Sequence, residues 1–256
     1  MTQAERRLYL IKELLAEDSR FSNYKPETMS EAEQKDLLRS LMNIRMPAPL
    51  GEEFLSIQDE YLKEELTDKG ISDIADLTPI EKGIYLWQGD ITTLKCDAIV
   101  NAANSQMLGC FIPLHNCIDN CIHTYAGMQL RKKCHDLMIA QGYEEPTGRA
   151  KITPAFNLPC KYVIHTVGPI VNVSLTDEHK ELLKSCYTSC LKTAEENGLK
   201  SIAFCCISTG VFGFPQKQAA QIAVETVREY QKHSDIKVIF NVFKDEDRII
   251  YENLLG

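Results

Sequence analysis

The segment Asp97-Ala-Ile-Val-Asn-Ala-Ala-Asn-Ser105 is the most informative stretch of the chain, and Gly89-Asp-Ile-Thr92 lies just before it. Residues 98–100 form a short, continuous apolar run, which is typical of a strand buried on both faces of a sheet. Similar short runs rich in β-branched and aromatic residues lie at 84–87, 162–165, 202–205 and 237–240. The chain from residue 83 onward therefore contains several short strands.

Helical segments lie between these runs. They span residues 119–141, 177–197 and 216–233, and Gly198 follows the second as a stop signal. Alternating strands and helices predict a three-layer α/β/α domain with a mixed, mostly parallel sheet over residues 83–256. Ligands of such domains bind beyond the carboxyl ends of the strands, so the segments after Val100 and Ile207 are the first candidates for a site.

Residues 1–82 have a different pattern, which is helical. Ser30 followed by Glu33 has the spacing of a capping box, and the segment 47–51 interrupts the helical pattern. Apolar residues recur at helical spacing on both sides of that break: Leu8, Ile11, Leu14 and Leu15 before it, and Phe54, Ile57, Tyr61 and Leu62 after it. We therefore expect a helical N-terminal extension whose apolar faces pack on the domain 83–256.

The charge of the chain is unevenly distributed. The formal net charge is -8, which disfavours nucleic acid and anionic membranes as partners. Residues 1–82 carry 11 basic and 18 acidic side chains, whereas residues 83–256 carry 17 and 18. The domain 83–256 is therefore nearly neutral, and its charge does not argue against a small anionic ligand.

The ten cysteines are interpreted through the compartment that the sequence indicates. No apolar run is long enough for a signal core or a membrane span, so we expect a cytoplasmic protein whose cysteines are core residues, metal ligands or nucleophiles. Cys186 and Cys190 share one face of a predicted helix, and Cys205 and Cys206 point to opposite faces of a predicted strand. We expect these four to be buried packing residues.

The segment Ile207-Ser-Thr-Gly-Val-Phe-Gly-Phe-Pro215 lies between a predicted strand and a predicted helix. Its glycines allow the backbone to turn its amides toward one point and to approach a ligand closely, which suits a diphosphate. The alternative is a tight turn that needs glycine for its conformation only.

These segments, in this order and at this separation, closely resemble the macrodomain family over residues 83–256. The resemblance implies an ADP-ribose site with adenine near Asp90 and Ile91 and the distal ribose between Asn104 and Phe214. It places the diphosphate on the second segment, at Ser208, Thr209, Gly210, Val211, Phe212 and Gly213. Structural roles remain open for three of these residues: a cap for Asp90, loop stabilisation for Asn104 and core packing for Phe214.

The sequence departs from the usual hydrolytic macrodomain directly after Asn104, where Cys110, His115 and Cys117 enter the loop. Two thiolates and an imidazole within eight residues can converge on Zn²⁺ and leave a fourth position open. This segment resembles the zinc-dependent branch of the family. Three alternatives stay open: a structural zinc closed by Cys121 or His123, cysteines that only pack, and a Cys–His nucleophilic pair.

The resemblance implies a zinc-dependent hydrolase that removes mono-ADP-ribose from protein side chains. Acidic, O-linked side chains are favoured because a carboxylate leaves without a dedicated general acid. Asp119 aligns with a family carboxylate at a helix start, where capping is the simpler role. A non-catalytic ADP-ribose-binding module and an O-acyl-ADP-ribose deacylase remain alternatives. The resemblance also implies a sirtuin-like ADP-ribosyltransferase and a lipoylated carrier protein as partners. For the N-terminal extension two roles stay open: recognition of the modified protein, or a docked, stabilising appendage remote from the site.

Overall fold

A six-stranded sheet lies at the centre of the computed structural model, which describes residues 1–256. The strand order is β2-β8-β7-β4-β6-β5, and every neighbouring pair is parallel except β5 with β6. The strands are β2 (Ile84–Gln88), β4 (Ala98–Ala103), β5 (Ala150–Pro154), β6 (Tyr162–Val167), β7 (Ser201–Phe204) and β8 (Lys237–Val242). The prediction of a mixed, mostly parallel sheet is confirmed.

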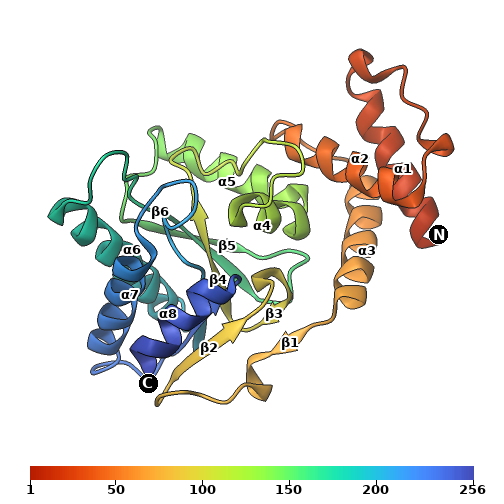
Figure 1. Ribbon diagram of the computed structural model, residues 1–256. Coiled ribbons are helices and arrows are strands. Elements are labelled where there is room, and N and C mark those ends of the chain that lie inside the picture. Colours follow the sequence, from red (N-terminus) through yellow and green to blue (C-terminus); the bar gives the residue numbers. More distant parts are fainter.

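Helices cover both faces of this sheet (Figure 1). They are α4 (Ile118–Ala126), α5 (Met128–Gln141), α6 (Asp177–Glu196), α7 (Gln216–Tyr230) and α8 (Asp245–Leu255). Neighbouring side chains of a strand point to opposite faces, and on β6 His165 contacts Cys134 of α5 whereas Thr166 contacts Cys186 of α6. Helices α4 and α5 therefore lie on one face, and α6, α7 and α8 pack together on the other.

The main core is a cluster of 44 buried apolar residues drawn from the sheet and these helices. Cys186, Cys190 and Cys205 belong to it, as predicted, and Cys206 packs against it while half-buried. The expected strand positions of the last two cysteines are wrong, because β7 ends at Phe204 and both residues follow it.

The predicted helix 119–141 is two helices in the structure. The first of them ends at Gly127, which has a left-handed φ of 95° and is the C-cap of α4. A Cβ atom there would lie 2.6 Å from Gln129 Oε1 and 2.8 Å from Gln58 Nε2, so a side chain would have to displace both amides in addition to straining the backbone, which favours glycine. The antiparallel edge strand β5 and the C-terminal helix α8 were not predicted either.

The N-terminal extension contains three long helices, of which two contact α4 while the first packs against the other two (Figure 1). They are α1 (Gln3–Ala16), α2 (Glu31–Ile44) and α3 (Glu52–Lys69), and the capping box of Ser30 and Glu33 is confirmed at the start of α2. A second cluster of ten buried apolar residues holds these helices together and includes Met128 of α5. Asn43 bonds Thr124, and Gln58 bonds the amide of Met128, so the extension is joined to the α/β body.

A short two-stranded sheet connects the extension to the body. Strand β1 (Ser72–Asp73) pairs in parallel with β3 (Leu94–Lys95). The remaining short elements are the 3-10 helices η1 (Ser19–Phe21), η2 (Pro26–Thr28), η3 (Ile74–Asp76) and η4 (Ile91–Thr93). None of the helices has both the length and the apolar character needed to cross a membrane.

Candidate functional site

Two loops follow neighbouring parallel strands and therefore leave the same edge of the sheet. The first loop (residues 104–117) joins β4 to α4, and the second loop (residues 205–215) joins β7 to α7. All but two of the site residues predicted from the sequence lie on these loops or at the start of α4. The exceptions are Asp90 and Ile91, which follow β2, the edge strand of the same sheet.

Asn104 begins the first loop, and its side chain is bonded within it. Its Nδ2 donates to the carbonyl of Gly109 at 3.2 Å, and its Oδ1 accepts from the amide of Gln106 at 3.1 Å. Nδ2 also lies 3.5 Å from Oδ2 of Asp119. The amide therefore stabilises the loop, which was the structural alternative for this residue, and stands directly beside the buried carboxylate.

Asp119 lies in the first turn of α4 and is only 6% exposed. Asn101 Nδ2 donates to its Oδ1 at 2.8 Å, and burial raises the pKa of the carboxyl to about 6. The helix is capped instead by Cys117, whose Sγ accepts from the amide of Asn120 at 3.4 Å. Capping is therefore not what the Asp119 side chain does.

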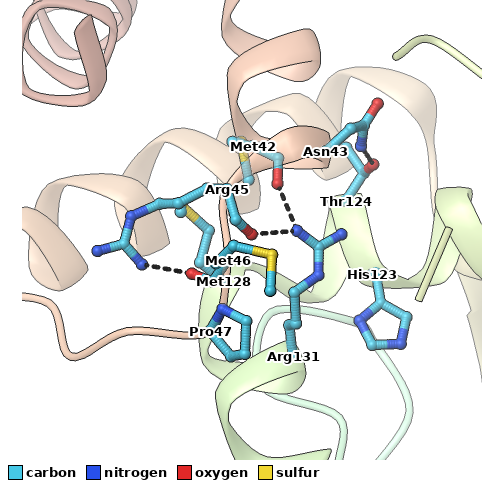
Figure 2. Close-up of a pocket in the computed structure, with 9 residues that line it drawn as sticks. All are labelled: Met42, Asn43, Arg45, Met46, Pro47, His123, Thr124, Met128 and Arg131. Carbon is cyan, nitrogen blue, oxygen red and sulfur yellow. Dashed lines mark hydrogen bonds between the residues drawn. The ribbon is translucent and has the colours of Figure 1, made fainter. Parts of the chain in front are cut away.

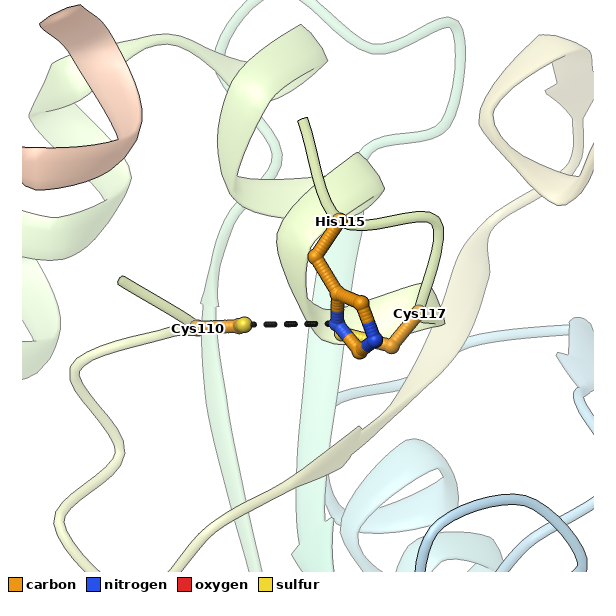
Figure 3. Close-up of side chains that lie close together, drawn as sticks. All are labelled: Cys110, His115 and Cys117. Carbon is orange, nitrogen blue, oxygen red and sulfur yellow. Dashed lines mark hydrogen bonds between the residues drawn. The ribbon is translucent and has the colours of Figure 1, made fainter. Parts of the chain in front are cut away.

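Three potential metal ligands converge in the first loop (Figure 3). Cys110 Sγ lies 3.5 Å from His115 Nδ1, and the donor atoms of Cys110, His115 and Cys117 all lie within 4.8 Å of one another. Zinc bonds of about 2.3 Å to sulfur and 2.0 Å to nitrogen place two ligand atoms about 3.6 Å apart at a tetrahedral centre. The donor set and its spacing therefore fit a zinc ion.

The two residues that would close a structural zinc site point elsewhere. Cys121 Sγ faces Arg39, whose Nη2 lies 3.8 Å away. His123 belongs to a separate buried group with Cys134 and His165. With neither residue among the convergent donors, the fourth position of a tetrahedral ion would have no ligand from this set of side chains.

The second loop is held mainly by its own backbone. The amide of Phe214 donates to the carbonyl of Ser208 at 2.9 Å, and the amide of Gly213 donates to that of Gly210 at 3.0 Å. Ser208 and Gly213 have left-handed φ values of 65° and 68°. A Cβ atom at Gly210 would meet nothing within 4 Å, so open space lies in front of this part of the loop.

The side chains of the second loop divide into buried and exposed ones. Phe214 is 2% exposed and belongs to the main core, so core packing, the alternative to a ribose contact, describes its position. Val211 is 82% exposed, Thr209 and Phe212 are half-buried, and Gly213 is exposed. What this loop can present to a ligand is therefore largely backbone.

Residues that follow β6 also lie at this edge of the sheet, against the second loop. They were not among the site residues predicted from the sequence. The amide of Val171 donates to the carbonyl of Phe212 at 2.8 Å. A Cβ atom at Gly168 would lie 2.0 Å from Oγ of Ser208, a hydroxyl that is buried and has no hydrogen-bond partner. The usable signal was the predicted strand 162–165, because the segment that follows it must leave the sheet at the same edge.

Asp90 is the N-cap of η4, which was the structural alternative for this residue. Its Oδ1 accepts from the amide and the hydroxyl of Thr92 at 3.0 and 2.6 Å. Its Oδ2 lies 3.3 Å from Nζ of Lys69, at the end of α3, and the same ammonium lies over the ring of Tyr125. Ile91 is 2% exposed. The extension thus reaches the predicted adenine region, which no local pattern in the sequence indicated.

Comparison with known proteins places this site in a family. The family model of the macro domain matches residues 100–223. A protein-ADP-ribose hydrolase of Treponema medium is 57% identical over the full length of both chains. A probable bifunctional ADP-ribose hydrolase/ADP-ribosyltransferase of Fusarium oxysporum is 42% identical over 94% of this chain and 45% of its own. The structure of the Trypanosoma brucei macrodomain in complex with ADP-ribose superimposes with a TM-score of 0.66 and 30% identity, over 85% of this chain and 95% of the other. The chain belongs to the macrodomain family.

Proposed function

We propose that the chain hydrolyses the bond between ADP-ribose and a modified protein side chain, and that a zinc ion held by the first loop takes part. The observation that carries the metal proposal is the convergence of Cys110, His115 and Cys117 directly after Asn104. The hydrolase proposal is supported by relatives that bear that name, one of them 57% identical over the whole chain.

The proposed ligand lies along the carboxyl edge of the sheet. Adenine is near Asp90 and Ile91, and the diphosphate faces the backbone from Ser208 to Phe212, where Gly210 has open space in front of it. The distal ribose is then near Asn104, next to the metal ligands. The related Trypanosoma brucei macrodomain has been solved with ADP-ribose, which supports this class of ligand.

In this proposal the thiolates of Cys110 and Cys117 and the imidazole of His115 hold the ion. A bound zinc ion supplies Lewis-acid polarisation of a ribose or ester oxygen, or lowers the pKa of a bound water. The Cys110 thiol and the His115 imidazole have a second thiol, that of Cys117, within 4.8 Å, and three convergent donors favour the metal interpretation over a Cys–His pair, which needs only one thiol.

The neighbouring polar side chains would orient the reacting ribose. Asp119 accepts from Asn101 and stands 3.5 Å from Nδ2 of Asn104, so it restricts the amide that faces the ribose. We assign neither residue the role of general acid. A carboxylate is a leaving group that does not require one, so an O-linked acidic side chain is the proposed attachment point.

The modifying enzyme is the proposed functional partner. The name of the Fusarium oxysporum relative gives it both an ADP-ribose hydrolase and an ADP-ribosyltransferase activity. The present chain aligns with 45% of that longer protein. A relative of that kind supports a separate ADP-ribosyltransferase as the source of the substrate here. A sirtuin-like transferase and a lipoylated carrier protein are the partners we propose.

The test is metal analysis together with product analysis on a modified protein. We expect about one zinc per chain, its loss in the triple variant Cys110→Ala, His115→Ala, Cys117→Ala, and release of free ADP-ribose from modified acidic side chains. Zinc-free wild-type protein, or turnover that survives chelation, would refute the metal role. A chain that binds ADP-ribose without releasing it is a binding module, and one that acts only on free O-acyl-ADP-ribose is a deacylase.

A further inference from the structure

We propose that helix α2 of the N-terminal extension positions the metal ligands of the first loop, with Arg39 and Asn43 as the positioning residues. The inference rests on the proposed zinc site in that loop. Neither residue is among the donors that could reach a metal, so each would act through the backbone of the loop. The extension would then be part of the catalytic unit.

Asn43 holds the loop backbone next to His115. It is 1% exposed, its Oδ1 accepts from the amide of Leu114 at 3.1 Å, and its Nδ2 donates to Oγ1 of Thr124 at 2.9 Å. Leu114 has a left-handed φ of 57°, a conformation that a residue with a Cβ atom rarely adopts without outside contacts. The hydrogen bond that Asn43 accepts from the Leu114 amide therefore stabilises the turn immediately before His115.

Arg39 links the backbone at His115 to the backbone at Cys110. Its Nη2 donates to the carbonyl of His115 at 2.8 Å and to Oδ1 of Asn120 at 3.1 Å. Asn120 is fully buried, and its Nδ2 in turn reaches the carbonyls of Cys110 at 3.3 Å and Ile112 at 3.0 Å. Arg39 thus acts on His115 directly and on Cys110 through one intervening side chain.

Arg131 joins the same helix to the first part of the loop, and Figure 2 shows its bonds to Met42 and Arg45 at the end of that helix. Its Nη1 donates to the carbonyls of Met42 and Arg45 at 2.9 and 2.7 Å, which end α2, and its Nε donates to the carbonyl of Leu108 at 2.8 Å. Its guanidinium also lies 4.3 Å from the ring centre of Phe111. The end of α2 is therefore tied to the residues that precede Cys110.

These contacts differ from ordinary docking of an appendage. Arg39 and Asn43 reach backbone groups of His115 and Leu114 in the loop itself. Outside the extension, Gln58 of α3 reaches Gln129 and the amide of Met128, at the start of α5. Residues that orient metal ligands without touching the metal lower metal affinity or activity by about 10- to 100-fold when removed. A purely structural role would lower stability and leave the metal affinity of the folded protein unchanged.

The experiment compares Arg39→Ala and Asn43→Ala with the wild-type chain and a matched control. Arg6→Ala is the control, because the Arg6 guanidinium contacts Gln3, Glu60 and Glu64, all within the extension and away from the first loop. Zinc affinity is measured by competition with a chelator, ADP-ribose affinity by calorimetry, and kcat and KM on modified protein.

We expect zinc binding to weaken by about 10- to 100-fold in the two variants, with lower kcat and with KM and ADP-ribose affinity unchanged. Arg39→Lys should recover part of the zinc affinity, since it retains a donor for the carbonyl of His115. Arg6→Ala should match wild type. Unchanged zinc affinity in folded Arg39→Ala, or an equal loss in Arg6→Ala, overturns the inference.

A measurement on metal-free protein separates this inference from the proposed function. Wild-type protein that holds no zinc would refute the metal role, whatever the variants do. Hydrogen exchange of the Leu114 amide then tests the positioning contact alone. Faster exchange in Asn43→Ala than in Arg6→Ala supports a loop held by α2, and equal exchange in the two overturns it.

Discussion

The two loops at the carboxyl edge of the sheet are built in different ways. The first loop carries the side chains Cys110, His115 and Cys117, and other elements hold its backbone through Asn43 and Arg39. The second loop makes its hydrogen bonds mainly within itself, and the buried side chains of Cys205, Ile207 and Phe214 attach it to the core. A loop that presents side-chain ligands needs support from elsewhere, whereas a loop that presents backbone amides needs only the right local turns.

This contrast assigns different consequences to changes in the two loops. Substitutions in the first loop should act on turnover and leave most of the binding energy of adenosine and diphosphate in place. Substitutions in the second loop should lower the affinity for ADP-ribose. The contrast between the loops is wrong if a first-loop substitution mainly lowers this affinity, or if a second-loop substitution mainly lowers turnover.

The largest effect is expected from removing metal ligands. Cys110→Ser with Cys117→Ser should lower turnover of modified protein by about 1,000-fold, because Lewis-acid stabilisation of several kcal/mol is lost. Calorimetry should show that ADP-ribose binding largely remains. If ADP-ribose affinity falls as steeply as turnover does, the first loop is a binding element and the contrast is wrong.

A charged side chain at Gly210 should have the next largest effect. Gly210→Glu places a carboxylate in the open space proposed for the diphosphate, and repulsion at about 4 Å should weaken ADP-ribose binding by about 100-fold or more.

The melting temperature of Gly210→Glu should remain close to that of wild type, since a Cβ atom there meets no neighbour. Gly210→Ala is the matched control and should bind ADP-ribose normally. Unchanged affinity in folded Gly210→Glu would remove the second loop from the site.

The smallest expected effect is on the pH dependence of stability, through the buried histidines His123 and His165. Burial lowers the pKa of His165 to about 3 and that of His123 well below its ordinary value. The unfolded chain binds protons on both rings below about pH 6.5 while the folded chain does not, so each histidine lowers stability as pH falls. Asp119, with a pKa raised to about 6, opposes this because the folded state takes up a proton there.

His165→Gln should therefore make stability less dependent on pH. The free energy of unfolding of wild type should fall relative to the variant by about 1.4 kcal/mol per pH unit below about pH 6. Denaturant unfolding between about pH 7 and pH 5 measures this difference. Parallel curves for the two proteins would show that the folded state accommodates a proton on His165.

The strands and the loops were accessible from the sequence because their signals are local. Five strands were predicted from short apolar runs, and the two loops were located because ligands of α/β domains bind where parallel strands end. The edge strand β5 and helix α8 were missed. The break at Gly127 was also missed, because a glycine inside a helical pattern shows its role only when Gln58 and Asn157 are seen to crowd it.

By itself the sequence determined the order of strands and helices from residue 83, the capping box at Ser30 and the grouping of three metal-ligand side chains in one loop. Each depends on neighbours within a few residues. Only the tertiary structure decided that Arg39 would meet His115, 76 residues away, and that Lys69 would meet Asp90. The reason is physical: helical spacing shows that a face is apolar and must be buried, but it carries no information about which surface covers it.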